Sequence, residues 1–186
     1  MILSIDDGCA SDVRVAALAE KYGIECIFYW PVEHRSLAYA NGYEPLTFEQ
    51  QMKIADSFTI GSHTLTHRHL TKLTLEEARA EIIDSKWILE DMLGVDINSF
   101  CFPRGYSSPD VDKIVYQHYE SARRTKGYDD DNNKLVHVHP NSGANDNRRW
   151  QDCIVDKNKT HLWMHSYDLD RHSMWEDLEK VLKEYS

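Results

Sequence analysis

The sequence predicts an α/β fold in which parallel strands are covered by helices. Short apolar runs alternate with segments of helical periodicity along the chain, polar residues cluster where the apolar runs end, and no linker or internal repeat divides the 186 residues. A chain of this length is long enough for one domain with a sizeable core. We therefore expect a single domain over residues 1–186, built either as a barrel or as a doubly wound sheet.

The N-terminal part predicts a strand, a helix and a second strand. Residues 2–5 are a short apolar run before Asp-Asp-Gly, and residues 13–22 carry apolar residues at helical spacing before Gly23. Residues 24–30 are β-branched and aromatic and stop at Pro31, which is typical of a buried strand. Because a helix separates the two strands, they are expected to run parallel.

The next part begins with an irregular segment. Residues 31–46 contain two prolines and a glycine, so no regular element is expected there. Thr47 is a helix cap for a helix that ends near Ser57, and residues 58–61 predict a third strand. A Thr-x-x-Glu capping box then introduces a long amphipathic helix over residues 75–93.

The second half continues the alternation of strands and helices. Strands are expected at residues 97–102, 120–124, 135–138 and 161–165, and helices at residues 109–118 and 173–185. Residues 127–152 are rich in Asp, Asn, Gly and charge, so this stretch is predicted to be mostly loop, as is the segment after residue 165.

The net charge and the N-terminal residues disfavour some binding partners and locations for this chain. The net charge is -10, from 31 acidic and 21 basic residues, which disfavours nucleic acid and anionic membrane surfaces. The first residues contain no basic segment followed by a long apolar run, so neither a signal peptide nor a membrane span is expected. These features predict a cytoplasmic protein, or an extracellular one if a leader has been removed.

The four cysteines predict neither a zinc knuckle nor a redox motif. Cys9, Cys26, Cys101 and Cys153 are widely spaced and form no CxxC pair. A domain of this size does not need disulfides for stability. We therefore expect free thiols in the core and a reducing compartment.

Two adjacent carboxylates follow the first predicted strand. Asp6 and Asp7 precede Gly8, which lets the chain turn sharply. Parallel α/β proteins build their sites at this end of the strands. Neighbouring strand residues point to opposite sides, so one carboxylate is suited to ligate a metal and the other to handle a proton. On its own, Asp-Asp-Gly is also typical of a plain turn.

A histidine pair follows the third predicted strand. His63 and His67 are four residues apart, which in a helical turn places both imidazoles within reach of one ion. Their position at a strand end, like that of Asp-Asp, favours a metal site over surface histidines. One carboxylate and two imidazoles suit Zn²⁺, with Co²⁺, Ni²⁺ or Fe²⁺ as substitutes, and leave positions open for water. His69 is interpreted as a loop residue or as support for a ligand.

Two further strand ends carry candidate residues. Pro103, Arg104 and Gly105 predict a tight loop, in which a backbone N–H is a candidate for stabilising an oxyanion, although these residues also fit a plain turn. His165 ends the last predicted strand. It is expected to project over the same end of the strands as Asp6 and His63, with Trp163 lining or supporting the site there.

These four elements, in this order, resemble the polysaccharide deacetylases of carbohydrate esterase family four, also called the NodB homology domain. The first motif of that family, usually T-F-D-D-G, is matched by residues 4–8, and the second, H-[ST]-x-x-H, by residues 63–67. Leu70 fits the longer form of the second motif. The resemblance runs from the first strand to the last and implies a distorted (β/α) barrel of about seven parallel strands.

The resemblance also implies a role for each motif residue. Asp6 is the position of the catalytic base, and Asp7, His63 and His67 are the positions of the ligands of one divalent ion. His165 takes the position of the general acid. The implied reaction is hydrolysis of an N-acetyl group on an amino sugar.

The third motif departs from the commonest family pattern, R-P-P-Y-G. Cys101 stands where the arginine would be, and Arg104 replaces the tyrosine. Residues 122–125, Ala-Arg-Arg-Thr, resemble a variant in which a later A-R-T segment supplies the arginine. The resemblance therefore implies that Arg123 orients the base, with Arg124 as the rival.

The fourth motif of the family, an Asp and a Trp that support the acid histidine, has no clear match. Trp150 and Asp152 are the candidates. Pro103, Arg104, Gly105, Tyr106 and Trp163 are the residues expected near the substrate or the oxyanion.

Three other functions remain open at this stage. The chain is expected to deacetylate a polysaccharide or oligosaccharide of the chitin, peptidoglycan or N-acetylglucosamine type. The alternatives are hydrolysis of an N-acyl amide on a small intracellular metabolite, a non-catalytic carbohydrate-binding relic of the fold, and a phosphoesterase. The phosphoesterase would normally need more ligands, for two ions.

Overall fold

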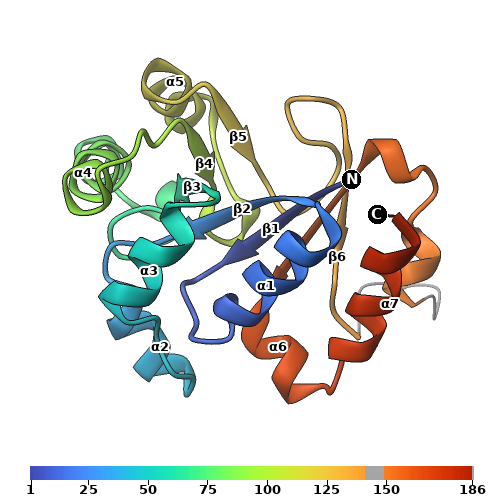
Figure 1. Ribbon diagram of the computed structural model, residues 1–186. Coiled ribbons are helices and arrows are strands. Elements are labelled where there is room, and N and C mark those ends of the chain that lie inside the picture. Colours follow the sequence, from blue (N-terminus) through green and yellow to red (C-terminus); the bar gives the residue numbers. More distant parts are fainter. Residues whose placement is uncertain (141–148, 186) are drawn as a thin grey trace.

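The computed structural model describes residues 1–140 and 149–185. Their seven strands are β1 (Ile2–Asp6), β2 (Glu25–Trp30), β3 (Thr59–Ser62), β4 (Ser99–Cys101), β5 (Ser121–Arg123), β6 (Lys134–His137) and β7 (Thr160–His165). They pair in the order β5-β4-β3-β2-β1-β7-β6, and every pairing is parallel. The sheet curls into an open half-barrel, so the predicted distorted (β/α) barrel of about seven parallel strands is confirmed (Figure 1).

Helices cover the outside of this sheet (Figure 1). They are α1 (Asp12–Tyr22), α2 (His34–Asn41), α3 (Phe48–Ala55), α4 (Leu75–Leu93), α5 (Pro109–His118), α6 (Ser166–Arg171) and α7 (Trp175–Tyr185). The short 3-10 helices are η1 (Leu70–Lys72), η2 (Pro103–Gly105), η3 (Trp150–Cys153) and η4 (Lys157–Lys159). The described residues form one domain, in which α1, α4, α5 and α6 each contact the strand beside them.

Strand alternation separates an apolar outer face from a polar inner face. In β1, Leu3 and Ile5 belong to the core between sheet and helices. Ser4 and Asp6 point the other way, into the barrel, where the Ser4 hydroxyl lies 2.8 Å from Nε2 of His161 in β7. The outer face therefore stabilises the fold, while the inner face carries the side chains that matter for chemistry.

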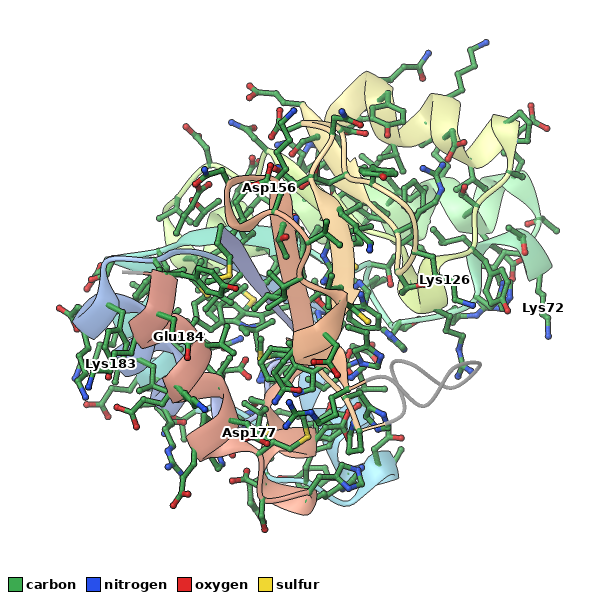
Figure 2. All side chains as sticks on the ribbon, turned by 90° about the vertical axis from the view of Figure 1, so that its right-hand side faces the viewer. Lys72, Lys126, Asp156, Asp177, Lys183 and Glu184 are labelled. Carbon is green, nitrogen blue, oxygen red and sulfur yellow. The ribbon has the colours of Figure 1, made fainter. Side chains whose placement is uncertain are left out.

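The C-terminal helix illustrates how the outer layer is built. α7 buries Trp175 and Leu178 and exposes Asp177, Lys183 and Glu184, which Figure 2 labels on the outside of the molecule. This pattern is that of an amphipathic helix lying on a core. Among the described residues, no helix combines the length and the apolar character needed to cross a bilayer.

Two segments expected to be irregular contain helices. The stretch 31–46 holds α2, which ends at Gly42 with a left-handed φ of 71°. The segment after residue 165 begins directly with α6. Both helices have fewer than nine residues, so they are too short for helical periodicity to stand out in the sequence. The four cysteines are free thiols, as expected, and Cys153 is the only one of them that is partly exposed.

Candidate active site

The predicted site residues lie at the carboxyl ends of the strands. Asp6 closes β1 and His165 closes β7, and the two residues are direct neighbours across that strand pair. Arg123 closes β5, while Asp7 and His63 each follow a strand directly. Segments far apart in the sequence therefore meet at one end of the barrel, as parallel strands require.

Asp7, His63 and His67 form one group, in which one ligand atom from each residue lies within 4.8 Å of the others. The Nε2 atoms of His63 and His67 are 3.7 Å and 3.5 Å from the same oxygen, Asp7 Oδ1. This oxygen is buried and has no hydrogen-bond partner among the described residues. A buried carboxylate oxygen without a partner is costly, so this group fits a bound cation.

Both imidazoles are in the state that a metal ligand needs. Nδ1 of His63 lies 2.7 Å from the carbonyl oxygen of Cys101, so Nδ1 carries the proton and donates it. The lone pair is then on Nε2, the atom that faces Asp7. Burial lowers the pKa of His63 and of His67 to about 4, so both rings are neutral at neutral pH.

The histidine pair lies in a loop, so the predicted helical turn is wrong. Thr64 and His67 have left-handed φ values of 71° and 60°, which an α-helix does not contain. The loop is held by Glu81 of α4, a buried carboxylate that accepts hydrogen bonds from the N–H and the hydroxyl of Thr66. No pattern in the sequence points to Glu81, because only the packing of α4 brings it to the loop.

The backbone of Asp7 leaves the strand alternation. Its φ is 80°, and its N–H donates to the Tyr29 carbonyl. As a result, Asp6 and Asp7 each have a carboxylate oxygen within 4.8 Å of a ring nitrogen of His63, instead of pointing to opposite sides. Asp7 Oδ2 accepts a hydrogen bond of 3.2 Å from the Tyr167 hydroxyl.

Asp6 is held by an arginine, as the A-R-T resemblance implies. Arg123 forms a buried ion pair and hydrogen bond with Asp6 Oδ1, and its guanidinium lies 4.8 Å from the centre of the Tyr29 ring. Burial raises the pKa of Asp6, but Arg123 and the nearby histidines outweigh it and lower the pKa to about 2. Arg124 instead contacts Ser107 and Asp112.

Cys101 occupies the position of the missing motif arginine and lies beside Asp6. Its Sγ donates to Asp6 Oδ2 over 3.7 Å. Asp6, His63 and Cys101 thus form a second group with ligand-like spacing that shares His63 with the first. Burial raises the pKa of the Cys101 thiol well above its ordinary value, so the sulfur stays protonated and is a poor ligand.

His165 is positioned by Asp168, not by Trp150 or Asp152. Nδ1 of His165 lies 3.3 Å from Asp168 Oδ2, and Nε2 lies 3.6 Å from Asp7 Oδ2. Trp150 packs in the core, and Asp152 is exposed and bonds to the N–H of Arg149, so the two sequence candidates are wrong.

Two carboxylates flank His165 and keep its ring charged. Burial lowers the pKa of His165, but the hydrogen bond to Asp168 and the charges of Asp7 and Asp6 raise it to about 9. The His-x-x-Asp spacing of His165 and Asp168 is the sequence signal that was overlooked, because α6 was not predicted.

The loop after β4 is tight, as expected. Arg104 and Gly105 have left-handed φ values of 60° and 74°, and the Gly105 N–H donates to the Phe102 carbonyl. Tyr106 follows the loop with 58% of its surface exposed, and its ring stacks on His69 at 4.7 Å. His69 therefore supports the rim of the site and is not part of the Asp7 group.

Trp163 forms part of the wall of the site. Its ring stacks face to face on His137 at 3.7 Å, and its Nε1 donates to the Thr125 carbonyl. The Arg123 guanidinium lies 5.5 Å from the ring centre. Trp163 is buried, and it packs against Arg123, which holds Asp6.

The fold has several solved relatives. A deacetylase from Streptococcus pyogenes in complex with acetate is 18% identical with a TM-score of 0.59, covering 68% of this chain and 56% of that one. A peptidoglycan deacetylase from Bacillus subtilis is 16% identical with a TM-score of 0.68, covering 99% and 83%. A pseudoenzyme of carbohydrate esterase family four from Bacillus anthracis is 15% identical with a TM-score of 0.62, covering 97% and 61%. The chain thus spans little more than half of the Streptococcus protein.

Sequence comparison agrees with these structural similarities. No curated protein sequence matches the chain significantly. The family model described as polysaccharide deacetylase matches residues 1–119, which include the carboxylate pair, the histidine pair and the loop after β4. This match covers well over half of the 186 residues. The chain therefore belongs to the polysaccharide deacetylase family.

Proposed function

We propose that the chain is a metal-dependent deacetylase that hydrolyses the N-acetyl groups of amino sugars in a polysaccharide or oligosaccharide of the chitin, peptidoglycan or N-acetylglucosamine type. The observation that carries the proposal is the buried, unpartnered Asp7 Oδ1, which faces Nε2 of both His63 and His67. Two neutral imidazoles and a carboxylate are a ligand set for Zn²⁺, with Co²⁺, Ni²⁺ or Fe²⁺ as substitutes.

The cation is the Lewis acid of the site. Asp7, His63 and His67 would hold it, and it would polarise the amide carbonyl and lower the pKa of a water molecule. The three protein ligands leave room for water and substrate, as catalytic zinc sites do.

Asp6 is the general base, and Arg123 sets its charge and direction. The ion pair with Arg123 keeps Asp6 ionised at neutral pH, so the carboxylate is ready to take a proton from the attacking water. Arg123 is buried against Tyr29 and Trp163, so it holds the carboxylate in one orientation.

His165 is the general acid. Its raised pKa means that the ring carries a proton at neutral pH, and it delivers this proton to the departing amine. Asp168 accepts from Nδ1 and thereby directs Nε2 toward the site. Acetate and a free amino sugar are the products.

The loop from Pro103 to Tyr106 faces the substrate in this proposal. Since the Gly105 N–H already bonds to the Phe102 carbonyl, the Arg104 backbone N–H is our proposed donor to the oxyanion at this left-handed turn. The exposed ring of Tyr106 offers a flat apolar face for a sugar.

Acetate release tests the proposal. N-acetylglucosamine oligomers should release acetate when Zn²⁺ is present, release should stop with a chelator, and it should return when Zn²⁺ is added back. Asp6→Asn should keep the ion but lose at least roughly a hundredfold in rate, because the base is gone. Asp91→Asn, an exposed change on α4, is the matched control and should react like the wild type. Normal turnover by Asp6→Asn would refute the role of the base.

The same assay decides between the alternatives. The likeness to a pseudoenzyme favours a non-catalytic carbohydrate-binding relic as the second candidate, and complete absence of acetate release from a zinc-loaded chain would support it. Faster release from a small N-acyl amine than from an oligomer would identify a metabolite amidohydrolase instead.

A further inference from the structure

A second histidine–aspartate cluster lies beside His165. One ligand atom each from His139, Asp168 and His172 lies within 4.8 Å of the others. The His139 and His172 rings are 5.1 Å apart, centre to centre. None of the motifs found in the sequence includes His139 or His172.

The elements explain why these residues meet. Asp168 belongs to α6, and His172 caps that helix four residues later, so the two side chains lie on the same helical face. His139 follows β6, which pairs with β7 just before α6 begins. The cluster is therefore built on the end of β6 and on α6, the helix that directly follows β7 beside the active site.

We infer that His139, Asp168 and His172 bind a second divalent cation of the zinc class, more weakly than the first site does. Two imidazoles and one carboxylate are the same donor set as in the first site. Zinc ligands lie about 2.0–2.2 Å from the ion, so the three ligand atoms must move toward one another by roughly 1 Å. His172 is exposed and free of the core, so its ring is able to rotate into place.

Three features make this site the weaker one. Asp168 already accepts a hydrogen bond from His165 Nδ1, and Arg171 Nη1 lies 4.0 Å from its other oxygen. Each carboxylate oxygen therefore has a partner that competes with the ion. His172 is exposed, and ordering its side chain costs entropy. In contrast, Asp7 Oδ1 in the first site is buried and without a partner. The net charge of -10 attracts cations to both sites.

Occupancy of the second site has a consequence that rests on the proposed function. An ion held by Asp168 competes with His165 for the same carboxylate. His165 then loses the partner that directs its Nε2 toward the departing amine. Excess Zn²⁺ is therefore expected to inhibit the deacetylase that one equivalent of Zn²⁺ activates.

Zinc binding tests the site directly. Protein carrying one tightly bound ion is titrated with zinc chloride by calorimetry or equilibrium dialysis. We expect one further ion per chain, bound more weakly than the first. His172→Gln should bind this ion at least roughly tenfold more weakly. His118→Gln, which removes a histidine at the end of α5, is the matched control and should bind it like the wild type. A chain that takes up no second ion, or a His172→Gln variant with wild-type affinity for it, would overturn the inference.

Activity gives a separate readout. Excess Zn²⁺ should reduce acetate release by the wild type and by His118→Gln, over the concentrations that fill the second site, and should reduce it much less in His172→Gln. Equal inhibition of all three proteins would overturn the inhibitory role. If the chain released no acetate at all, the proposed function would fail, while the binding titration would still decide whether the second site exists.

Discussion

The charge state of His165 depends on single residues around it. Asp7 and Asp168 lie on opposite sides of its ring, and their charges outweigh the effect of burial on its pKa. Neighbouring charges also outweigh burial at Asp6, where Arg123 lowers the pKa to about 2 and keeps the carboxylate ionised. An ionised Asp6 and a protonated His165 therefore coexist at neutral pH, as the proposed base and acid require.

Changing Asp168 should move the alkaline limit of activity. Asp168→Asn keeps a hydrogen-bond acceptor for Nδ1 but removes the charge, so the pKa of His165 should fall from about 9. Since the reaction needs protonated His165, the alkaline limb of the kcat profile should shift to lower pH by roughly one unit or more. Asp177→Asn, an exposed change on α7, should leave the profile unchanged. An unmoved alkaline limb in Asp168→Asn would argue against this acid.

The sequence predicted the position of some site residues better than that of others. Asp7 and His63 come just after predicted strands, and parallel strand ends meet at one end of a barrel, so their convergence could be expected. Asp168 and Glu81 belong to helices and reach the site through packing. No local pattern encodes such a contact, so the sequence could not show it.

At the scale of elements, long regular segments were predictable and short ones were not. The helices α4 and α5 match the predicted ranges 75–93 and 109–118, because Thr74 and Gly94 mark the ends of α4, and Ser108 and Pro109 mark the start of α5. By contrast, α6 has six residues, and the sequence predicts a loop there. The histidine pair has helical spacing but lies in a loop, because left-handed residues and Glu81 determine its shape.

The loop after β4 depends on a glycine in a confined position. Gly105 and Gly94 have similar left-handed φ values, 74° and 69°. A Cβ on Gly105 would lie 2.2 Å from Oγ1 of Thr125 and 2.9 Å from its backbone nitrogen, whereas a Cβ on Gly94 would meet nothing within 4 Å. Comparing substitutions at Gly94 and Gly105 therefore separates the cost of a left-handed backbone from the cost of a steric clash.

Alanine substitutions at these two glycines should differ in cost. Gly94→Ala should lower the free energy of unfolding by about 1 to 2 kcal/mol, the cost of a left-handed alanine. Gly105→Ala should lower it by roughly 1 to 3 kcal/mol more, because Thr125 and the loop must also move. Urea denaturation of both variants measures the difference. Equal losses would mean that Thr125 does not confine the loop.

For the molecule as a whole, burying neutral histidines makes the metal-free protein sensitive to acid. The pKa of His63 and of His67 is about 4 in the folded chain, against an ordinary value of 6.5, and burial lowers that of His137 to about 3. The unfolded chain therefore binds more protons between pH 6.5 and 4. The stability contributed by these three histidines is fully present above pH 6.5 and falls as the pH drops through this window.

Urea denaturation of the metal-free protein at several pH values should show this loss. A depression of the size found for His63 corresponds to roughly 3 kcal/mol. The free energy of unfolding should fall steadily from pH 6.5 toward pH 4, and His63→Gln should reduce the slope. A flat profile between these pH values, or an unchanged slope in His63→Gln, would contradict the burial of neutral imidazoles.

The whole account depends on Asp7, His63 and His67 holding one ion at the mouth of the barrel. X-ray absorption at the zinc edge, on protein loaded with one equivalent of Zn²⁺, tests this most directly. We predict nitrogen and oxygen neighbours at about 2.0–2.2 Å, with two imidazoles among them and no sulfur. A sulfur neighbour at about 2.3 Å would place the ion on the group that contains Cys101 and would contradict the account.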